Sequence, residues 1–289
     1  MQLTILNRLL KFKRTLFGLP FTLSGALLAL ACDEFTPVHW SVAPLILLAF
    51  FAARSAGMAF NELIDRSIDA ANPRTASRVL PSNAMAPRTV FAIGAASLLL
   101  LFAACYGISP KVFALSSLGA LLIVLYSYTK RVTALCHFVL GAVHLLGPLM
   151  AWLAVGGGWG LAPLLLGGAA ALYIAGNDII YAIQDVEFDK GWALKSLPVT
   201  LGIEGSFILV RTLHACASLL LISLGVILAL PIIYYVGIAC ALGLNLRRHL
   251  RLSRGMQEGL TEQIVKSNLE LSLSTLASIL LVLVWRVLS

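Results

Sequence analysis

Long apolar runs recur along the whole chain, and they limit its fold more than any other feature. Each run is long enough for a helix to cross the hydrocarbon core of a bilayer, which takes roughly 17 to 25 residues. Composition agrees, with 60% hydrophobic and only 12% charged residues. The sequence therefore predicts an all-α integral membrane protein with about nine transmembrane helices. The predicted spans are residues 15–32, 41–60, 89–107, 110–128, 134–155, 160–180, 206–228, 229–245 and 270–287.

The basic residues predict the orientation of these spans. Of the 21 lysines and arginines, 18 lie before the first span or after an even-numbered one, counting Arg211 near the start of the seventh span. Because cytoplasmic loops are enriched in Lys and Arg, we expect a cytoplasmic N-terminus and an external C-terminus, in a bacterial inner membrane. The cluster of Arg247, Arg248, Arg251 and Arg254 fits this topology signal and contact with anionic lipid. The basic loops are too short to form a nucleic-acid groove, and no obligate protein partner is evident.

The chain is predicted to form one polytopic domain over residues 1–289. Its acidic motifs follow spans two and six, which suggests a pseudo-repeat of four helices, 15–128 and 134–245, with a ninth helix at 270–287. Two boundaries, at Ser109-Pro110 and at Leu230-Pro231, leave open whether two helices are one long kinked helix. The five cysteines are widely spaced and contain no CxxC pair, so neither a disulfide framework nor a zinc site is indicated.

A polar motif follows the second span. Asn61, Asp65 and Asp69 recur every four residues, so a helix would place them on one face. Arg54 lies seven residues before Asn61, about two turns deeper on the same face. A second motif follows the sixth span, where Asp178, Tyr181, Asp185 and Asp189 are three, four and four residues apart. Both motifs are predicted at the cytoplasmic ends of their spans.

Two facing sets of carboxylates predict a site for hard divalent cations. Magnesium in particular favours carboxylates together with phosphate oxygens. Metal ions and basic side chains can stabilise a departing diphosphate, and a lipid-lined interior suits an isoprenoid tail. The predicted reaction is therefore ionisation of an allylic diphosphate. The basic residues beside the acids are Arg66, Arg74, Arg78, Lys130, Arg131, Lys190 and Lys195.

The order of these motifs resembles that of a known family, the UbiA-type intramembrane prenyltransferases. The resemblance covers nearly the whole chain. Its first motif is Asn61-x3-Asp65-x3-Asp69, followed by Arg74-Thr75 and Arg78-x-Leu80-Pro81; its second is Asp178-x2-Tyr181-Ala182-x2-Asp185-x3-Asp189; and a tyrosine–lysine motif, Tyr126-x3-Lys130-Arg131, lies between them.

The resemblance implies nine helices around a central cavity, two Mg²⁺ ions, and transfer of a polyprenyl group from polyprenyl diphosphate to an aromatic acceptor. The implied metal ligands are Asn61, Asp65, Asp69, Asp185 and Asp189. The residues predicted to act in catalysis are Asp65, Asp69, Asp185, Asp189 and Tyr181. Those predicted to bind substrate are Arg54, Asn61, Arg78, Tyr126, Lys130, Arg131, Asp178 and Lys195.

The acceptor stays open between two aromatic acids. The elements around Arg74 and Arg78 resemble the branch that prenylates 4-hydroxybenzoate in ubiquinone synthesis. The segment from Cys136-His137 to Gly141 is similar to relatives that prenylate 1,4-dihydroxy-6-naphthoate in the futalosine route to menaquinone. Both acceptors carry a carboxylate, which suits the buried, bidentate guanidinium of Arg54. His137 is interpreted either as a helix-packing residue or as part of the cavity wall.

A membrane transporter is the alternative from another class, because carriers also combine repeats with intramembrane charges. The predicted acids, however, lie at one membrane face and not at the midplane, where carriers bind their cargo. The sequence therefore favours an enzyme.

Overall fold

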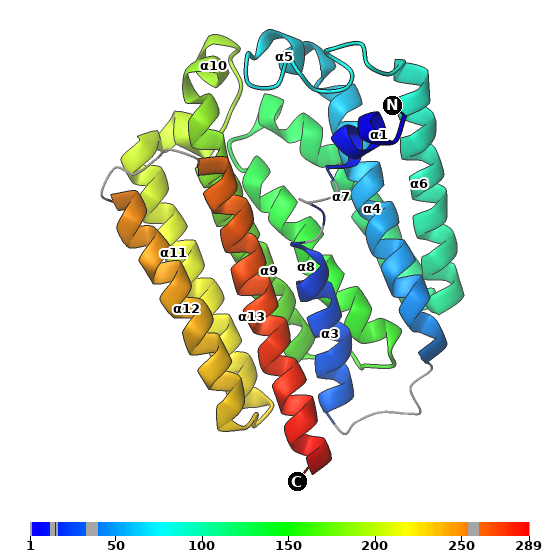
Figure 1. The fold of residues 1–289 in the computed structure, drawn as a ribbon, viewed down its shortest axis with the longest axis vertical. Coiled ribbons are helices and arrows are strands. Elements are labelled where there is room, and N and C mark those ends of the chain that lie inside the picture. The colour runs from blue at the N-terminus through cyan, green and yellow to red at the C-terminus, as the bar shows by residue number, and fades with distance from the viewer. Residues whose placement is uncertain (1, 12–14, 16, 33–39, 254–259, 289) are drawn as a thin grey trace.

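The computed structural model describes residues 2–11, 15, 17–32, 40–253 and 260–288, and every regular element in them is helical (Figure 1). Lys13, Arg14 and Arg254, which the topology prediction counts, lie outside the described residues. The long helices are α3 (Leu19–Ala31), α4 (Ala43–Ile64), α6 (Pro87–Ile108), α7 (Pro110–Val132), α8 (Cys136–Ala154), α9 (Leu161–Ala182), α11 (Leu197–Ile227), α12 (Ile232–Ser253) and α13 (Leu260–Leu288). The short ones are α1 (Gln2–Leu10), η1 (Trp40–Val42), α5 (Arg66–Ala71), η2 (Ile183–Asp185) and α10 (Val186–Gly191).

Each of the nine predicted spans overlaps one of these long helices. In the described part of the chain, seven helices are long and apolar enough to cross a membrane. Helix α3 has 13 residues, or about 20 Å at 1.5 Å per residue, less than the roughly 30 Å of a hydrocarbon core. Helix α12 has arginines in its last two turns and is not among the seven. A count of nine crossings therefore stays a prediction, as does the division into two four-helix halves.

Proline sets where several helices begin. It occupies the first turn of α4, α6, α7 and α11, where its missing N–H would have no partner anyway. Ser109 caps α7, accepting a hydrogen bond from the Val112 backbone N at 3.3 Å. Likewise α11 ends at Ile227 and α12 begins at Ile232. The two boundaries that the sequence left open thus each separate two helices.

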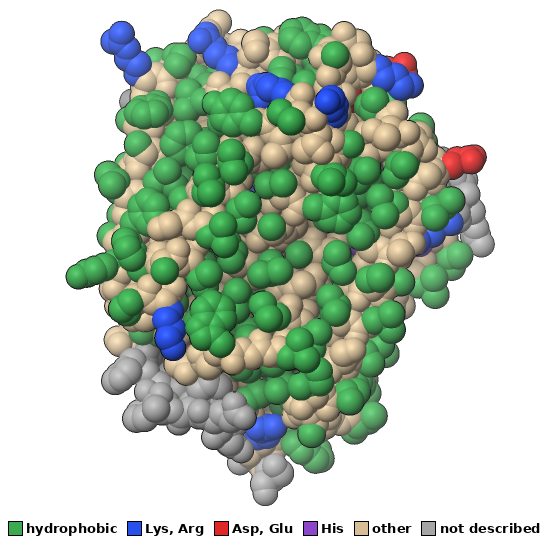
Figure 2. Space-filling view, turned by 180° about the vertical axis from the view of Figure 1, so that it is seen from behind, with side chains coloured by type: hydrophobic (Ala, Val, Ile, Leu, Met, Phe, Trp, Pro, Cys, Tyr) green, Lys and Arg blue, Asp and Glu red, His purple; other side chains and the backbone are tan. Residues whose placement is uncertain are grey.

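The short helices mark one end of the bundle. In Figure 1, α5 and α10 lie together at the top, with α1 close by, and the C-terminus lies at the opposite end. We call the end that carries α5 and α10 the polar end. Hydrophobic side chains cover most of the face shown in Figure 2, and lysines and arginines gather mainly near its upper edge. This distribution matches a surface immersed in lipid with one charged rim.

Helices α3 and α8 pack closely at Gly25, and a substitution there tests how tightly the bundle is packed. A Cβ built on Gly25 of α3 would lie 2.1 Å from the carbonyl oxygen of Pro148 in α8. Gly25→Ala is therefore expected to push the two helices apart and to destabilise the protein by roughly 1 to 3 kcal/mol. Thermal unfolding in detergent would measure this loss. Gly158→Ala is the matched control, because no atom lies within 4 Å of its Cβ position; equal melting of both variants would contradict the packing argument.

Candidate active site

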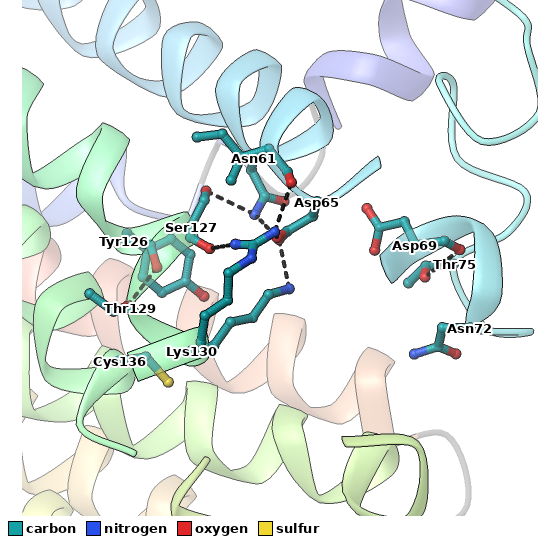
Figure 3. A network of polar contacts seen from close by, with 12 residues as sticks. Asn61, Asp65, Asp69, Asn72, Thr75, Tyr126, Ser127, Thr129, Lys130 and Cys136 are labelled. Atoms are coloured by element: carbon teal, nitrogen blue, oxygen red, sulfur yellow. Dashed lines mark hydrogen bonds and ion pairs between the residues drawn. The ribbon is translucent and has the colours of Figure 1, made fainter. Parts of the chain in front are cut away.

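The sequence predicted that the first motif lies on one face of a single helix, and this prediction is wrong. Helix α4 ends at Ile64, and Asp65, with φ −94° and ψ 6°, joins it to α5. Asn61 and Asp65 stay together, but Asp69 belongs to α5 and lies apart from them (Figure 3). The second motif breaks in the same way, because α9 ends at Ala182 and is followed by η2 and α10. The spacing of four residues correctly predicted neighbours within a turn but not beyond the helix end.

Asp65 is the centre of the first cluster, and only 1% of its surface is exposed. Its carboxylate accepts hydrogen bonds from Asn61 Nδ2 at 2.9 Å and Lys130 Nζ at 2.7 Å (Figure 3). It also accepts one from Arg131 Nη2 at 3.1 Å. Arg131 also donates to the Ile64 carbonyl at 2.8 Å. The tyrosine–lysine motif at the end of α7 is therefore attached directly to the first acidic motif.

Asp69 has a different cation. Its carboxylate forms an ion pair with Arg78, whose Nη1 also lies 3.4 Å from Asn61 Oδ1. The hydroxyl of Thr75 donates to the Asp69 carbonyl at 3.1 Å, which holds the intervening loop against α5. Arg78 thus connects the separated halves of the first motif.

Asp185 of the second motif is held by the loop of the first. Arg74 Nε donates to its Oδ1 at 2.8 Å, Arg74 also forms an ion pair with Oδ2, and Asn72 Nδ2 donates to Oδ1 at 2.9 Å. The Arg74 guanidinium also donates to the Tyr181 hydroxyl and lies 4.7 Å from that ring's centroid. Burial lowers the pKa of Arg74, but the hydrogen bonds to Asp185 and Tyr181 outweigh it, so that the net pKa is raised and the side chain stays cationic. Asp189 accepts a bond from Ser196 Oγ at 3.3 Å.

Asp178 lies deeper along α9 and has its own partners. His137 Nδ1 lies 2.7 Å from Asp178 Oδ2, and the Tyr126 hydroxyl lies 3.5 Å from the same oxygen. His137 is buried, with 2% of its surface exposed. Of the two interpretations offered for His137, a hydrogen-bonded packing residue describes it better, and its partner is a predicted site residue.

Lys195 differs from the other predicted cations. Its Nζ donates to the Val132 carbonyl at 2.9 Å, and its backbone N donates to the Lys130 carbonyl at 2.7 Å. These contacts fix the loop before α11 against the end of α7. A role for Lys195 in binding substrate stays a prediction.

Three residues in these clusters had no predicted role. Ser127 accepts a hydrogen bond from Asn61 at 3.2 Å, and Asn72 binds Asp185. Glu62 is fully buried, and its Oε2 accepts a bond from the Leu80 backbone N at 3.1 Å. In the sequence, only their position close to a motif residue could have indicated that these three residues belong to the site. Contacts across 18 to 113 positions cannot be read from helical spacing.

A cavity of about 320 Å³ opens beneath these clusters. Along α4 its wall reaches from Asn61 to Ile46, or about 22 Å at 1.5 Å per residue. Most of the lining is apolar. Arg54 lies in the wall, with its guanidinium carbon 5.7 Å from the centroid of the Phe17 ring. The predicted site residues that line the cavity are Arg54, Asn61, Arg78, Tyr126, Asp178 and Tyr181.

The predicted metal ligands fit Mg²⁺ by chemistry but do not form a complete site alone. Among the described residues, no three His, Cys, Asp or Glu side chains converge as a metal-binding group. Asp65, Asp69 and Asp185 each hold a basic side chain instead. Magnesium commonly takes one or two carboxylates and completes its shell with substrate phosphates and water. The arrangement therefore fits a metal that arrives with a diphosphate.

Comparisons with known proteins agree with this fold. The 4-hydroxybenzoate octaprenyltransferase of Aliivibrio fischeri (strain MJ11) is 33% identical over 204 residues, covering 71% of this chain and 71% of that protein. The enzyme of the same name from Aliivibrio salmonicida is 28% identical and covers 79% of this chain and 80% of its own length.

Two solved structures have the same architecture. The apo structure of a UbiA homolog from Aeropyrum pernix K1 has a TM-score of 0.83 at 29% identity, covering 92% of this chain and 97% of that one. A UbiA homolog from Archaeoglobus fulgidus, bound to DMAPP and Mg²⁺, has a TM-score of 0.75 at 22% identity, covering 96% and 99%. The family model described as "UbiA prenyltransferase family" matches residues 19–262. This chain is therefore a membrane prenyltransferase that belongs to the UbiA prenyltransferase family.

Proposed function

We propose that this protein transfers a polyprenyl group from polyprenyl diphosphate to an aromatic hydroxy acid of the 4-hydroxybenzoate type, in a Mg²⁺-dependent step of quinone synthesis. One observation carries the proposal: charged clusters from α4, α5, α7 and the end of α9 meet at the mouth of one long apolar cavity. A diphosphate suits the mouth, and an isoprenoid tail suits the cavity. The named relatives support 4-hydroxybenzoate as the acceptor.

The basic residues at the mouth are suited to exchange partners. Lys130, Arg78 and Arg74 each pair with a carboxylate, and each can turn to a phosphate oxygen when the diphosphate enters. The carboxylates released in this way, with Asn61, are the residues that would hold Mg²⁺. When bound, the metal neutralises charge that develops on the departing diphosphate. The metal ligands we propose are Asn61, Asp65, Asp69, Asp185 and Asp189.

The cavity wall provides the other half of the reaction. Its apolar lining excludes water from the carbon that loses the diphosphate, which protects a reactive allylic cation from hydrolysis. Tyr126 and Tyr181 lie between the mouth clusters and this lining. A ring carbon of the acceptor, ortho to its hydroxyl, would form the new bond and then lose its proton.

Arg54 is the residue that we assign to the acceptor. It lies seven residues below Asn61 on α4 and lines the same cavity. A guanidinium binds a carboxylate through two parallel hydrogen bonds, which fixes the direction of the attached ring. Bound to Arg54, a 4-hydroxybenzoate would extend its phenolic ring along the cavity.

We also propose that the polar end faces the bacterial cytoplasm, with the N-terminus on that side and the C-terminus outside. The charge distribution supports this orientation, because the short helices α5 and α10 and the loop after α5, all at that end, carry Arg66, Arg74, Arg78 and Lys190. A transporter is less consistent with the described residues, since most acids of the two motifs lie in or beside α5 and α10 at one end of the bundle and not midway.

Turnover by the purified protein tests the proposal. The protein in detergent or lipid is given a polyprenyl diphosphate, Mg²⁺ or EDTA, and 4-hydroxybenzoate or 1,4-dihydroxy-6-naphthoate in parallel, with product followed by mass. We expect prenylated 4-hydroxybenzoate, its loss with EDTA and its recovery when Mg²⁺ is restored. Product from the naphthoate alone would move the enzyme to the futalosine route, and metal-independent product would reject the Mg²⁺ assignment.

A further inference from the structure

Arg248 is buried in a helix whose other arginines face outward. It lies in α12, and 8% of its surface is exposed, whereas Arg247 and Arg251 are exposed. The sequence grouped all of them as topology signal and lipid contact. For Arg248 the lipid contact is wrong, because its side chain points into the bundle; its part in the topology signal stays a prediction.

The guanidinium of Arg248 joins four helices through neutral partners. It donates to Asn177 Oδ1 of α9 at 2.7 Å and to Asn245 Oδ1 of α12 at 3.1 Å, and it lies 3.0 Å from His214 Nδ1 of α11. It also donates to Ser267 Oγ of α13. Among the described residues, no carboxylate lies within ion-pair distance of it. A buried charge without an ion-pair partner is costly, so stability alone does not account for this residue.

The network ends at the wall of the cavity. Asn177 accepts from Arg248 through its oxygen and donates through its Nδ2 to Asn268 Oδ1 of α13, so both ends of its amide are fixed. Asn177 and Asn268 both line the cavity. The residue after Asn177 is Asp178, and one turn further along α9 is Tyr181. The orientation of Asn177 is therefore coupled to that of two proposed site residues.

The rotation of α9 decides what those residues meet. Successive side chains on a helix are about 100° apart, so a modest rotation would turn Asp178 away from His137 and Tyr126. The same rotation would move Tyr181 relative to Arg74. A one-ångström error in such a site can lower the rate by about a hundredfold.

We infer that Arg248 is a positioning residue: by binding Asn177 against α11 and α13, it fixes the rotation of α9 that presents Asp178 and Tyr181 to the cavity. The inference rests on the proposed prenyl transfer for its readout. The inferred role of Arg248 concerns α9 only. The proposed ligand of the acceptor, Arg54, lies on α4, so a test can separate an effect on α9 from an effect on acceptor binding.

The test compares Arg248→Met and Arg248→Lys with Arg251→Met, which removes one exposed cation from the same helix. With geranyl diphosphate, Mg²⁺ and 4-hydroxybenzoate, we expect Arg248→Met to lower kcat per folded molecule at least about tenfold. The KM for 4-hydroxybenzoate should change less than about twofold, because its proposed ligand is on α4. Arg251→Met should behave as wild type. Wild-type kcat in folded Arg248→Met would overturn the inference.

If Arg248→Met does not fold, the kcat of Arg248→Lys is compared with that of wild type instead. Lysine keeps the charge, but its single ammonium cannot reach Asn177, His214 and Ser267 together. We expect a kcat below wild type, and a wild-type value would overturn the inference. A double-mutant cycle with Asn177→Ala adds a second readout: the two substitutions should be non-additive if Arg248 acts through Asn177, and independent effects would contradict this route.

Binding of Mg²⁺ and geranyl diphosphate separates this inference from the proposed acceptor. If the wild type binds both but makes no product, the acceptor is wrong. Arg248→Met is then expected to bind the diphosphate about tenfold more weakly than Arg251→Met does, because a displaced Tyr181 no longer holds Arg74, one of the cations proposed to bind the phosphates. Equal binding by the two variants would overturn the inference alone. No binding by the wild type would reject both the proposed function and the inference.

Discussion

Asp65→Ala is expected to lower turnover about a thousandfold, the upper range for loss of one preorganised charged group in an active site. Asp65 joins Asn61, Lys130 and Arg131, so its loss removes a proposed metal ligand and leaves the two cations without their carboxylate. The fold should survive, because Arg131 keeps its hydrogen bonds to the Ile64 and Ser127 carbonyls. Product formation at saturating Mg²⁺ and diphosphate measures the effect.

Glu187→Ala is the matched control for the loss of an acid at the polar end. Glu187 lies in α10, with 89% of its side chain exposed, and pairs only with Lys190 on the surface in the described contacts. We expect wild-type turnover from it. Asp185→Ala, which removes the partner of Arg74, should resemble Asp65→Ala. Turnover of Asp65→Ala within a few-fold of the Glu187→Ala value would exclude Asp65 from the metal site.

Arg54→Met is expected to lower kcat/KM for 4-hydroxybenzoate about a hundredfold, through a higher KM for the acid. Removing one partner of a buried charge pair typically costs 2 to 5 kcal/mol, and about 2.7 kcal/mol corresponds to a hundredfold. The KM for the polyprenyl diphosphate should stay close to wild type, because the mouth clusters do not include Arg54. Steady-state kinetics with each substrate varied in turn measures both values.

An acceptor without a carboxylate is the control for this assignment. 4-Hydroxybenzyl alcohol keeps the phenol and the ring but carries no charge for Arg54 to bind. Wild type and Arg54→Met should therefore use it at similar, low rates. If Arg54→Met loses activity equally with the acid and with the alcohol, then Arg54 supports the cavity and does not recognise the carboxylate.

Some contacts at the site followed from the sequence because they are local. Asn61 and Asp65 are four residues apart, and their side chains lie 2.9 Å apart. Tyr181 and Asp185 have the same spacing, but Asp185 lies in η2, beyond the end of α9, and the two residues meet through Arg74. Residues three or four apart on a helix are neighbours whatever the rest of the fold does. The prediction failed at Asp69, where the helix ends and helical spacing no longer applies.

The pairing of charges did not follow from the sequence. Helical periodicity could not indicate that Arg74 would bind Asp185, 111 positions away, while Lys130 would bind Asp65. The neighbouring arginines after the eighth span gave no sign that Arg248 would be buried while Arg247 and Arg251 are exposed. Each outcome depends on how helices pack against one another, and on which side of a helix then faces a neighbour.

The sequence by itself determined the membrane setting, the helices and the gathering of acids and cations at one end. Those features come from the hydrophobic effect acting on long apolar runs and from the cost of placing charge in lipid, and both depend on short stretches of chain. Only the tertiary structure decided where the helices break, which cation holds each acid, and that Arg248 reaches the wall of the cavity. Those features depend on contacts between helices, which arise only when distant segments pack together.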